Sequence, residues 1–416
     1  MLALGAAVVL AGCSHSPDEQ SPGREATGTK EVQEKLAAQI RAPEGQTRVR
    51  RTFKVDSGKP ATALPPYDYS EQPEGEKGRV VARDVEADVA PSGWSARPAP
   101  GYKRIVTGDL ETGVEMEHEY SLEEMGRVWA EARARGMNDA STAEDVAAAE
   151  HGELPGVTPT AWSYGIDARS ALPLNGTYPA THRELGRMGS VNGNCTGTMV
   201  GRRLVLTAAH CFIRPDLAIL SQSYTARRDS TSAPYGTVSS IGYSYDSEYT
   251  ANNCHITRTA ATRESCLYTD WALLILPSTW TSGTPGWMGY WIPGTTPTTS
   301  SVTRHYGYPM CGTTGPSGCV TDRAYGDLFA GKLSNYRTPD YNGDPEAFDH
   351  GLDMSPGHSG GALWTDYPGA GGPYLIGVNT DEYCAGTTCT LAFPNGGKLM
   401  TNWLAGVISS ARVSYP

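Results

Sequence analysis

The chain has 416 residues, with 34 Lys and Arg against 45 Asp and Glu, so its formal net charge is −11. It contains 48 Gly and 29 Pro, which is typical of loop-rich β proteins and secreted proteins. The acidic balance argues against a nucleic-acid-binding protein, because neutralising phosphates requires clustered Lys and Arg. No segment has the ~18 consecutive apolar residues that a membrane-spanning helix needs.

The first element in chain order is a short apolar segment over residues 1–10, which is too short for a membrane helix and fits an export signal. The string Leu10-Ala11-Gly12-Cys13 resembles a bacterial lipobox, in which the cysteine is lipidated and becomes the mature N-terminus. We therefore expect a lipoprotein signal peptide over 1–12 and a lipid on Cys13. The protein would be exported and attached to the bacterial cell envelope, or released from it after processing. An ordinary signal peptide with a chance cysteine is the alternative.

The distribution of charged residues, Pro and Gly divides the chain into segments. Residues 1–160 hold 18 basic and 27 acidic side chains (18 − 27 = −9), and residues 161–416 hold 16 and 18 (16 − 18 = −2). Residues 13–117 are expected to be a tether and a Pro/Gly-rich linker. Residues 118–160 are expected to be helical, because Ser121-x-x-Glu124 and Ser141-x-x-Glu144 both fit the capping box. This helical segment is interpreted as a pro-segment or as a spacer.

The pattern of apolar and polar residues changes again from residue 161. Short apolar runs at 204–209, 271–276 and 374–378, separated by Gly, Ser, Thr and Pro, predict the strands of an all-β domain. The end of the chain has apolar residues at helical spacing, which predicts one C-terminal helix packed on that domain. These residues are Leu399, Met400, Trp403, Leu404, Val407 and Ile408.

The number and placement of the cysteines indicate that the protein resides in an oxidising compartment. Cys13 lies alone, and the other eight fall within 161–416, which indicates a disulfide framework. Their order favours local pairs: Cys195–Cys211, Cys254–Cys266, Cys311–Cys319 and Cys384–Cys389. A zinc site is a weaker alternative, because the chain has no C-x₂-C pair.

Three residues lie in local patterns that are typical of catalytic residues. His210 follows an apolar run directly, Asp270 opens another, and Ser359 lies in the Gly-rich string Gly357-His358-Ser359-Gly360-Gly361. Glycines let the backbone turn tightly, expose the serine and free amides for an oxyanion. Each feature alone also fits a structural role: a core histidine, a strand-edge carboxylate or a plain turn.

The order of the three residues along the chain separates two enzyme classes. The string G-x-S-x-G matches the nucleophile elbow of α/β-hydrolases, in which the histidine follows the serine. No histidine follows Ser359, so that order cannot be built. The available order is His210, Asp270, Ser359, which is the order of chymotrypsin-like proteases.

On these residues, region 161–416 resembles a trypsin-like serine protease, and within that group the bacterial V8-like branch of glutamyl endopeptidases. The matching strings are residues 194–200, 207–211, the strand after Asp270, 307–309, 357–361 and 375–378. The resemblance implies two six-stranded antiparallel β-barrels with the active site between them. It also implies a monomeric serine endopeptidase that acts on protein or peptide substrates.

The resemblance assigns roles to the residues. Ser359 would be the nucleophile, His210 the general base and Asp270 its orienting carboxylate, with the amides of Gly357 and Ser359 as the oxyanion hole. The alternative is a catalytically inactive surface lipoprotein that uses the protease fold for binding.

Two departures qualify this picture, one at the zymogen position and one in the specificity pocket. His358 stands where trypsin-like zymogens have an aspartate, so activation through a new N-terminal amine is not expected. Asp353 and Asn379 are candidate S1 specificity residues, and Asn379 replaces the histidine that V8-like enzymes use for P1 Glu.

No cofactor is expected. Asp340, Asn342 and Asp344 have the alternating oxygen ligands of a calcium loop, but Pro345 stands where such a loop needs glycine. A solvated polar turn is therefore favoured over a calcium site there.

Overall fold

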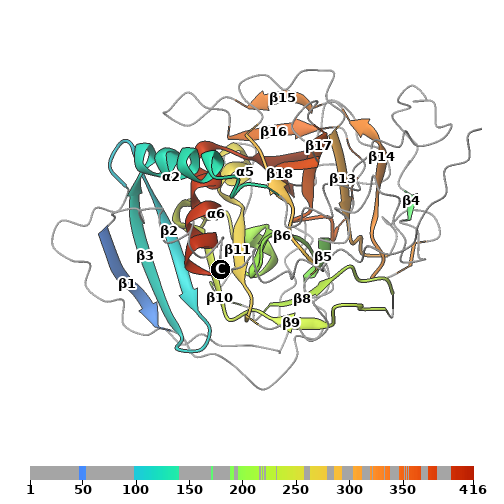
Figure 1. Ribbon diagram of the computed structural model, residues 1–416, viewed down its shortest axis with the longest axis horizontal. Helices are drawn as coiled ribbons and strands as arrows, with labels where there is room; N and C mark the ends of the chain where they lie inside the picture. The colour runs from blue at the N-terminus through green and yellow to red at the C-terminus, as the bar shows by residue number, and fades with distance from the viewer. Residues whose placement is uncertain are drawn as a thin grey trace, which may run out of the picture.

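A computed structural model describes these residues of the chain: 46–52, 98–139, 170–171, 188–191, 195–214, 217, 219, 222–230, 232–256, 263–278, 285–292, 303–311, 319–320, 322–331, 333–337, 346–350, 352, 354, 356–366, 373–381 and 395–416. They form two mostly antiparallel sheets, with a helix at the C-terminus (Figure 1). This all-β architecture confirms the expected fold class. No helix in the described ranges is long and apolar enough to cross a membrane.

The first sheet has ten strands in the order β1-β3-β2-β10-β11-β7-β6-β5-β8-β9. Their bounds are β1 Gln46–Thr52, β2 Tyr102–Asp109, β3 Val114–Ser121, β5 Met188–Val191, β6 Cys195–Gly201, β7 Leu204–Thr207, β8 Ser223–Ala226, β9 Thr237–Ser239, β10 Gly242–Asp246 and β11 Ala272–Ile275. The predicted runs at 204–209 and 271–276 therefore form neighbouring strands, β7 and β11.

The second sheet runs β15-β16-β19-β18-β17-β13-β14-β4, and β12 pairs with β18. The bounds are β4 Ser170–Ala171, β12 Gly289–Tyr290, β13 Thr303–Gly307, β14 Tyr325–Gly331, β15 Leu333–Arg337, β16 Ala347–His350, β17 Ala362–Asp366, β18 Pro373–Asp381 and β19 Asn395–Leu399. Apolar side chains of both sheets share one buried core, which includes Leu206, Trp271, Trp364 and Leu375.

Strands β1, β2 and β3 lie where the sequence indicated only a tether and linker, so that interpretation of residues 46–52 and 102–117 is wrong. Strand β2 pairs with β10, so these three strands extend the first sheet from seven strands to ten. The strands were missed because their charges are paired across the sheet: Arg104 Nε lies 2.7 Å from Glu119 Oε2. Cross-strand ion pairs let a polar sequence form a partly buried sheet.

Helix α2 (Leu122–Ala134) follows β3 directly. The Ser121 Oγ accepts the Glu124 amide at 3.0 Å, which confirms the first predicted cap. The helix begins at 122 rather than near 118, because residues 114–121 continue β3. The second predicted helix, at Ser141, lies outside the described residues, as do residues 1–13.

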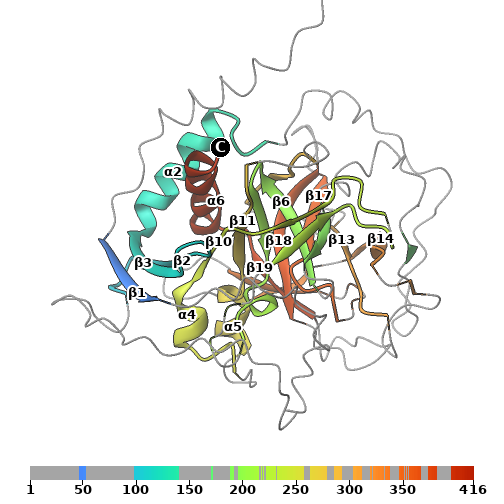
Figure 2. The ribbon, with the colours of Figure 1, turned by 90° about the horizontal axis from the view of Figure 1, so that it is seen from below.

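Helix α2 packs against the C-terminal helix α6 (Asn402–Ser414), as both ribbon views show (Figures 1 and 2). The approach is close: a β-carbon at Gly406 would lie 2.3 Å from the Met125 carbonyl oxygen. The predicted helix residues Trp403, Leu404, Val407 and Ile408 are buried in α6, whereas Leu399 and Met400 belong to the end of β19 and the residue after it.

The Arg412 guanidinium contacts parts of the domain that are far apart in the sequence. It donates to the carbonyls of Met137, Val200 and Met288, and it stacks 4.7 Å from the ring centre of Tyr290. One side chain of the last helix therefore ties the loop after α2 to both sheets.

Lys103 of β2 enters a buried ionic cluster, which we define as Lys103, Asp246, Glu346 and Lys398. Lys103 Nζ lies 2.5 Å from Glu346 Oε1, and Lys398 Nζ lies 3.3 Å from Glu346 Oε2. All four residues are at most 4% exposed. Burial would raise the pKa of Glu346, but Lys398 and Lys103 hold it at about 2. The cluster joins β2 to β10, to the residue that precedes β16, and to β19.

Asp246 gives the cluster a pH dependence. Burial raises its pKa from 3.8 to about 7, against the opposing effect of Lys103, with Glu248 and Glu346 adding to the rise. A raised folded-state pKa stabilises the fold at low pH, and this contribution is lost as pH rises from about 3.8 to about 7.

We therefore expect Asp246→Asn to gain stability over wild type as pH rises through this window. Urea unfolding of both proteins at several pH values measures the difference. Glu346 also titrates, and because its pKa is lowered, both proteins lose stability as the pH falls below about 4.5. This loss cancels in the difference between the two free energies of unfolding. A difference that stays constant from pH 4 to pH 8 would contradict a raised pKa for Asp246.

Candidate active site

His210 lies in a short 3₁₀ turn, η2 (Ala209–Cys211), directly after β7. Its Nδ1 lies 2.6 Å from Asp270 Oδ2, and its backbone amide donates to Asp270 Oδ1 at 2.9 Å. The side chain of Asp270 is fully buried, and that of His210 is 13% exposed. An ionised carboxylate only accepts, so the ring proton of a neutral His210 sits on Nδ1 and leaves Nε2 as the basic nitrogen.

Asp270 is brought to this place by the pairing of its strand. Ala272 of β11 pairs with Thr207 of β7, so the residues just before one strand meet those just after the other. Helix α4 (Ser247–Ala251) and helix α5 (Arg263–Thr269) precede β11, and the Asp270 amide donates to the Cys266 carbonyl at 3.1 Å. The carboxylate is thus held at the end of a short helix beneath the histidine.

Three of the four expected disulfides are bonded: Cys195–Cys211, Cys254–Cys266 and Cys311–Cys319. The pair Cys384–Cys389 lies outside the described residues. The sulfurs of Cys195 and Cys211 and a ring nitrogen of His210 lie within 4.8 Å of one another. Because both sulfurs are in a disulfide, they lack the thiolates that a zinc site requires.

Ser359 occupies the predicted Gly-rich turn between β16 and β17. Gly357 has φ +101° and Gly360 has φ +82°. A β-carbon would lie 2.2 Å from the Tyr308 carbonyl oxygen at the first position and 2.2 Å from the Thr196 carbonyl oxygen at the second. Both the left-handed backbone and the close neighbours therefore require glycine.

The turn is attached to the first sheet next to His210. The Thr196 amide donates to the Ser359 carbonyl at 2.8 Å, and Cys211 Sγ lies 3.8 Å from the same oxygen. Thr196 Oγ1 also donates to the Gly357 carbonyl at 2.7 Å. Ser359 thus comes from one sheet and His210 with Asp270 from the other, and the disulfide-bonded Cys211 lies between them.

The amides of the turn divide into two groups. Gly360 N donates to the Asn379 carbonyl at 2.7 Å, and Gly361 N donates to the His358 carbonyl at 2.9 Å. The amides of Gly357 and Ser359 donate to no backbone carbonyl within the described part of the chain. These two are the amides that the sequence pointed to as oxyanion donors.

The other predicted site residues have different surroundings. Asp353, Asp340, Asn342 and Asp344 lie outside the described residues. Asn379 is wholly buried. His358 is also wholly buried, and its Nε2 lies 3.2 Å from the Tyr325 carbonyl. The histidine that replaces the zymogen aspartate therefore points into the second sheet.

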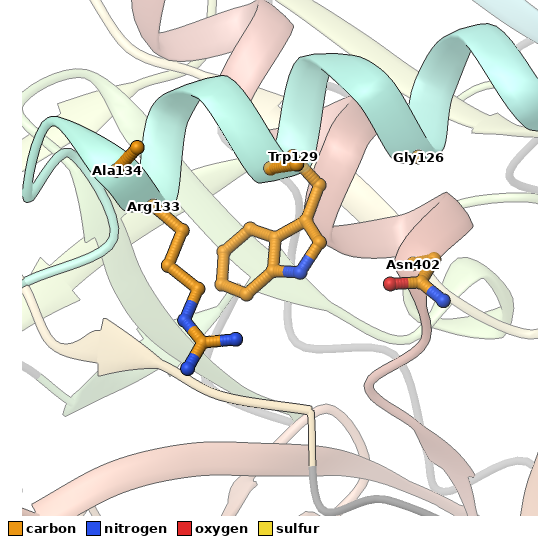
Figure 3. Close-up of a pocket in the computed structure, with 6 residues that line it drawn as sticks. Gly126, Trp129, Arg133, Ala134 and Asn402 are labelled. Carbon is orange, nitrogen blue, oxygen red and sulfur yellow. The ribbon is translucent and has the colours of Figure 1, made fainter.

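A shallow hollow of about 480 Å³ lies elsewhere, between α2 and the start of α6 (Figure 3). Trp129, Arg133 and Asn402 line it, and the Arg133 guanidinium lies 4.2 Å from the ring centre of Trp291. None of the three predicted catalytic residues lines this hollow, so it is no part of the candidate active site.

Three known proteins are similar to this chain over more than half of its length. Glutamyl endopeptidase of Bacillus licheniformis is 27% identical over 252 residues, which cover 58% of this chain and 68% of that protein. A solved structure of a Glu endopeptidase in complex with MPD is 18% identical, with a TM-score of 0.43 and coverage of 60% of this chain and 98% of that one. The protease Anisep from Arthrobacter nicotinovorans is 16% identical, with a TM-score of 0.38 and coverage of 56% and 98%.

The family model described as Trypsin matches residues 174–395, which is 395 − 174 + 1 = 222 of the 416 residues. The matched segment is more than half of the chain and contains His210, Asp270 and Ser359. The chain therefore belongs to the trypsin family.

Proposed function

We propose that this protein is a serine endopeptidase that hydrolyses peptide bonds through Ser359, His210 and Asp270. The observation that carries the proposal is the short contact between His210 and the buried Asp270, next to the glycine-held turn of Ser359. The trypsin-family match and the glutamyl endopeptidase relative support a protease.

The mechanism follows from the protonation state of the pair. His210 Nε2 takes the proton of Ser359 Oγ as the oxygen attacks the scissile carbonyl, and it then gives the proton to the leaving amine. Asp270 stabilises the imidazolium that forms in between. The amides of Gly357 and Ser359 bind the oxyanion, and losing one such donor typically costs about 10²–10³ in rate. Water then cleaves the acyl-enzyme by the same route.

The substrates are proteins or peptides, as for a protease of this family. The protein is exported, because its disulfide bonds are typical of an oxidising compartment. The lipid on Cys13 and the signal peptide over residues 1–12 remain predictions, because both lie outside the described residues. Metabolic labelling with a palmitate analogue, compared between wild type and Cys13→Ala, tests the lipid directly.

Labelling with a fluorophosphonate probe tests the proposed catalysis, because the probe reacts only with an activated serine. We expect the full-length protein to be labelled and Ser359→Ala to lose the label completely. Ser410→Ala, which changes a partly exposed serine of α6, is the matched control and should be labelled like wild type. A folded wild-type protein without label would instead favour the inactive binding module.

A further inference from the structure

We infer that Asn379 and His350 form a buried pair that positions the Ser359 amide in the oxyanion hole, and that Asn379 does not select the substrate. The inference rests on the proposed function, because it assigns two positioning residues to the same site. It replaces the prediction from sequence that Asn379 is an S1 specificity residue.

Asn379 contacts the turn on both sides of Ser359. Its Nδ2 donates to the His358 carbonyl at 3.4 Å, and its backbone amide donates to the Gly361 carbonyl at 2.9 Å. Its own carbonyl accepts the Gly360 amide at 2.7 Å. A single residue of β18 therefore holds the residues directly before and directly after the nucleophile.

His350, at the end of β16, fixes the orientation of the Asn379 amide. The Leu352 amide points at His350 Nδ1 at 3.3 Å, and His350 Nε2 lies 3.0 Å from Asn379 Oδ1. A backbone amide can only donate, so Nδ1 is the acceptor and the ring proton lies on Nε2. Nε2 then donates to Oδ1, and the NH₂ end of Asn379 has to face the His358 carbonyl.

This orientation bears on catalysis through one planar peptide unit. The His358 carbonyl and the Ser359 N–H belong to the same peptide bond, and the described residues contain no cis bond. In a trans peptide the two groups point in opposite directions. The His358 carbonyl accepts from both Asn379 Nδ2 and Gly361 N, so these two donors set the direction of the Ser359 N–H.

The same contacts remove Asn379 from substrate selection. Asn379 and His350 are both 0% exposed. The oxygen of the Asn379 amide is taken by His350 and its nitrogen by His358. Because both polar atoms face inward, a P1 side chain in the cleft has no atom of Asn379 to contact.

The test measures kcat and KM per active site in the full chain, with active sites counted by fluorophosphonate titration. We expect Asn379→Ala to lower kcat by about 10- to 100-fold, less than the loss of an oxyanion donor itself. KM should change by less than about threefold, and the P1 profile on a peptide library should not change. Asn379→Asp keeps the volume, but its ionised carboxylate cannot donate, so this variant should lose at least as much kcat at a pH where the group is ionised.

Two comparisons separate positioning from a general effect on folding. His350→Gln can still donate to Asn379 Oδ1, so it should keep several-fold more kcat than His350→Ala. Asn138→Ala is the matched control, because Asn138 is also buried and also donates from Nδ2 to a carbonyl at 3.4 Å, that of Tyr290, away from the turn. Its kcat per site should equal that of wild type.

An unchanged kcat per titrated site in both Asn379 variants would overturn the inference, and so would an altered P1 profile. Failure of the proposed function has a different signature, because the wild-type protein itself would then not be labelled.

Discussion

Asp270→Asn should lower kcat by about 10⁴, which is the size typical of this change in a Ser-His-Asp triad. The structure gives a specific reason. Asp270 Oδ1 accepts the backbone amide of His210, so the asparagine oxygen would keep this contact and its NH₂ group would face the ring. The NH₂ group would donate to Nδ1 and move the ring proton to Nε2. His210 could then no longer take the proton of Ser359.

Steady-state hydrolysis of a short peptide substrate measures this loss. Asp246→Asn is the control, because it also replaces a fully buried aspartate but lies in the ionic cluster. We expect the control to keep kcat within about threefold of wild type at pH 7. A loss for Asp270→Asn no larger than that of the control would exclude Asp270 as the residue that orients His210.

Lys103→Met should destabilise the protein by about 3–5 kcal/mol, because removing one partner of a buried ion pair leaves the other charge without compensation. Glu346 would lose its 2.5 Å contact and keep only Lys398 at 3.3 Å. Because Lys103 lies in β2 of the first sheet and Glu346 directly precedes β16 of the second, the loss should appear in one cooperative transition of the whole domain. Urea unfolding followed by tryptophan fluorescence gives the free energy of unfolding.

The matched control is Arg127→Met in α2, which lies in the same N-terminal segment. Arg127 pairs with Glu131 at 2.5 Å, but the two side chains are 39% and 33% exposed. Exposed pairs contribute about 0–1 kcal/mol, so this variant should unfold almost like wild type. Equal stability of the two variants would show that the hairpin of β2 and β3 is not part of the cooperative fold. Strands β2 and β3 would then be a separable segment.

The sequence predicted the parts of the site that depend on neighbours in the chain. His210 after an apolar strand, Asp270 before one, and Ser359 between required glycines are local patterns, and their order along the chain excluded the α/β-hydrolase arrangement. The bonded cysteine pairs are local too, with separations of 16, 12 and 8 residues.

The sequence did not reveal features that depend on distant partners. Lys103 and Glu346 are 243 residues apart, and Asn379 is 29 residues from His350. Strands β2 and β3 look like a solvated segment, because only the folded sheet places Arg104 opposite Glu119. The contacts of the Asn379 side chain with His350 and the His358 carbonyl were not visible either, because the position of a residue in a strand does not reveal its hydrogen-bond partners.

The packing of α2 against α6 constrains how this domain comes into being. Residues 122–134 are synthesised long before their partner helix, which comprises residues 402–414 and includes Arg412. Strand β2 similarly waits for β10, which begins 133 residues after β2 ends (242 − 109 = 133). Contacts of such long range form late, after much of the loop-closure entropy has been lost. A chain truncated before Arg412 would lose these contacts and leave α2 with an incomplete partner. Synthesis of α6 is thus itself a condition for the domain to close.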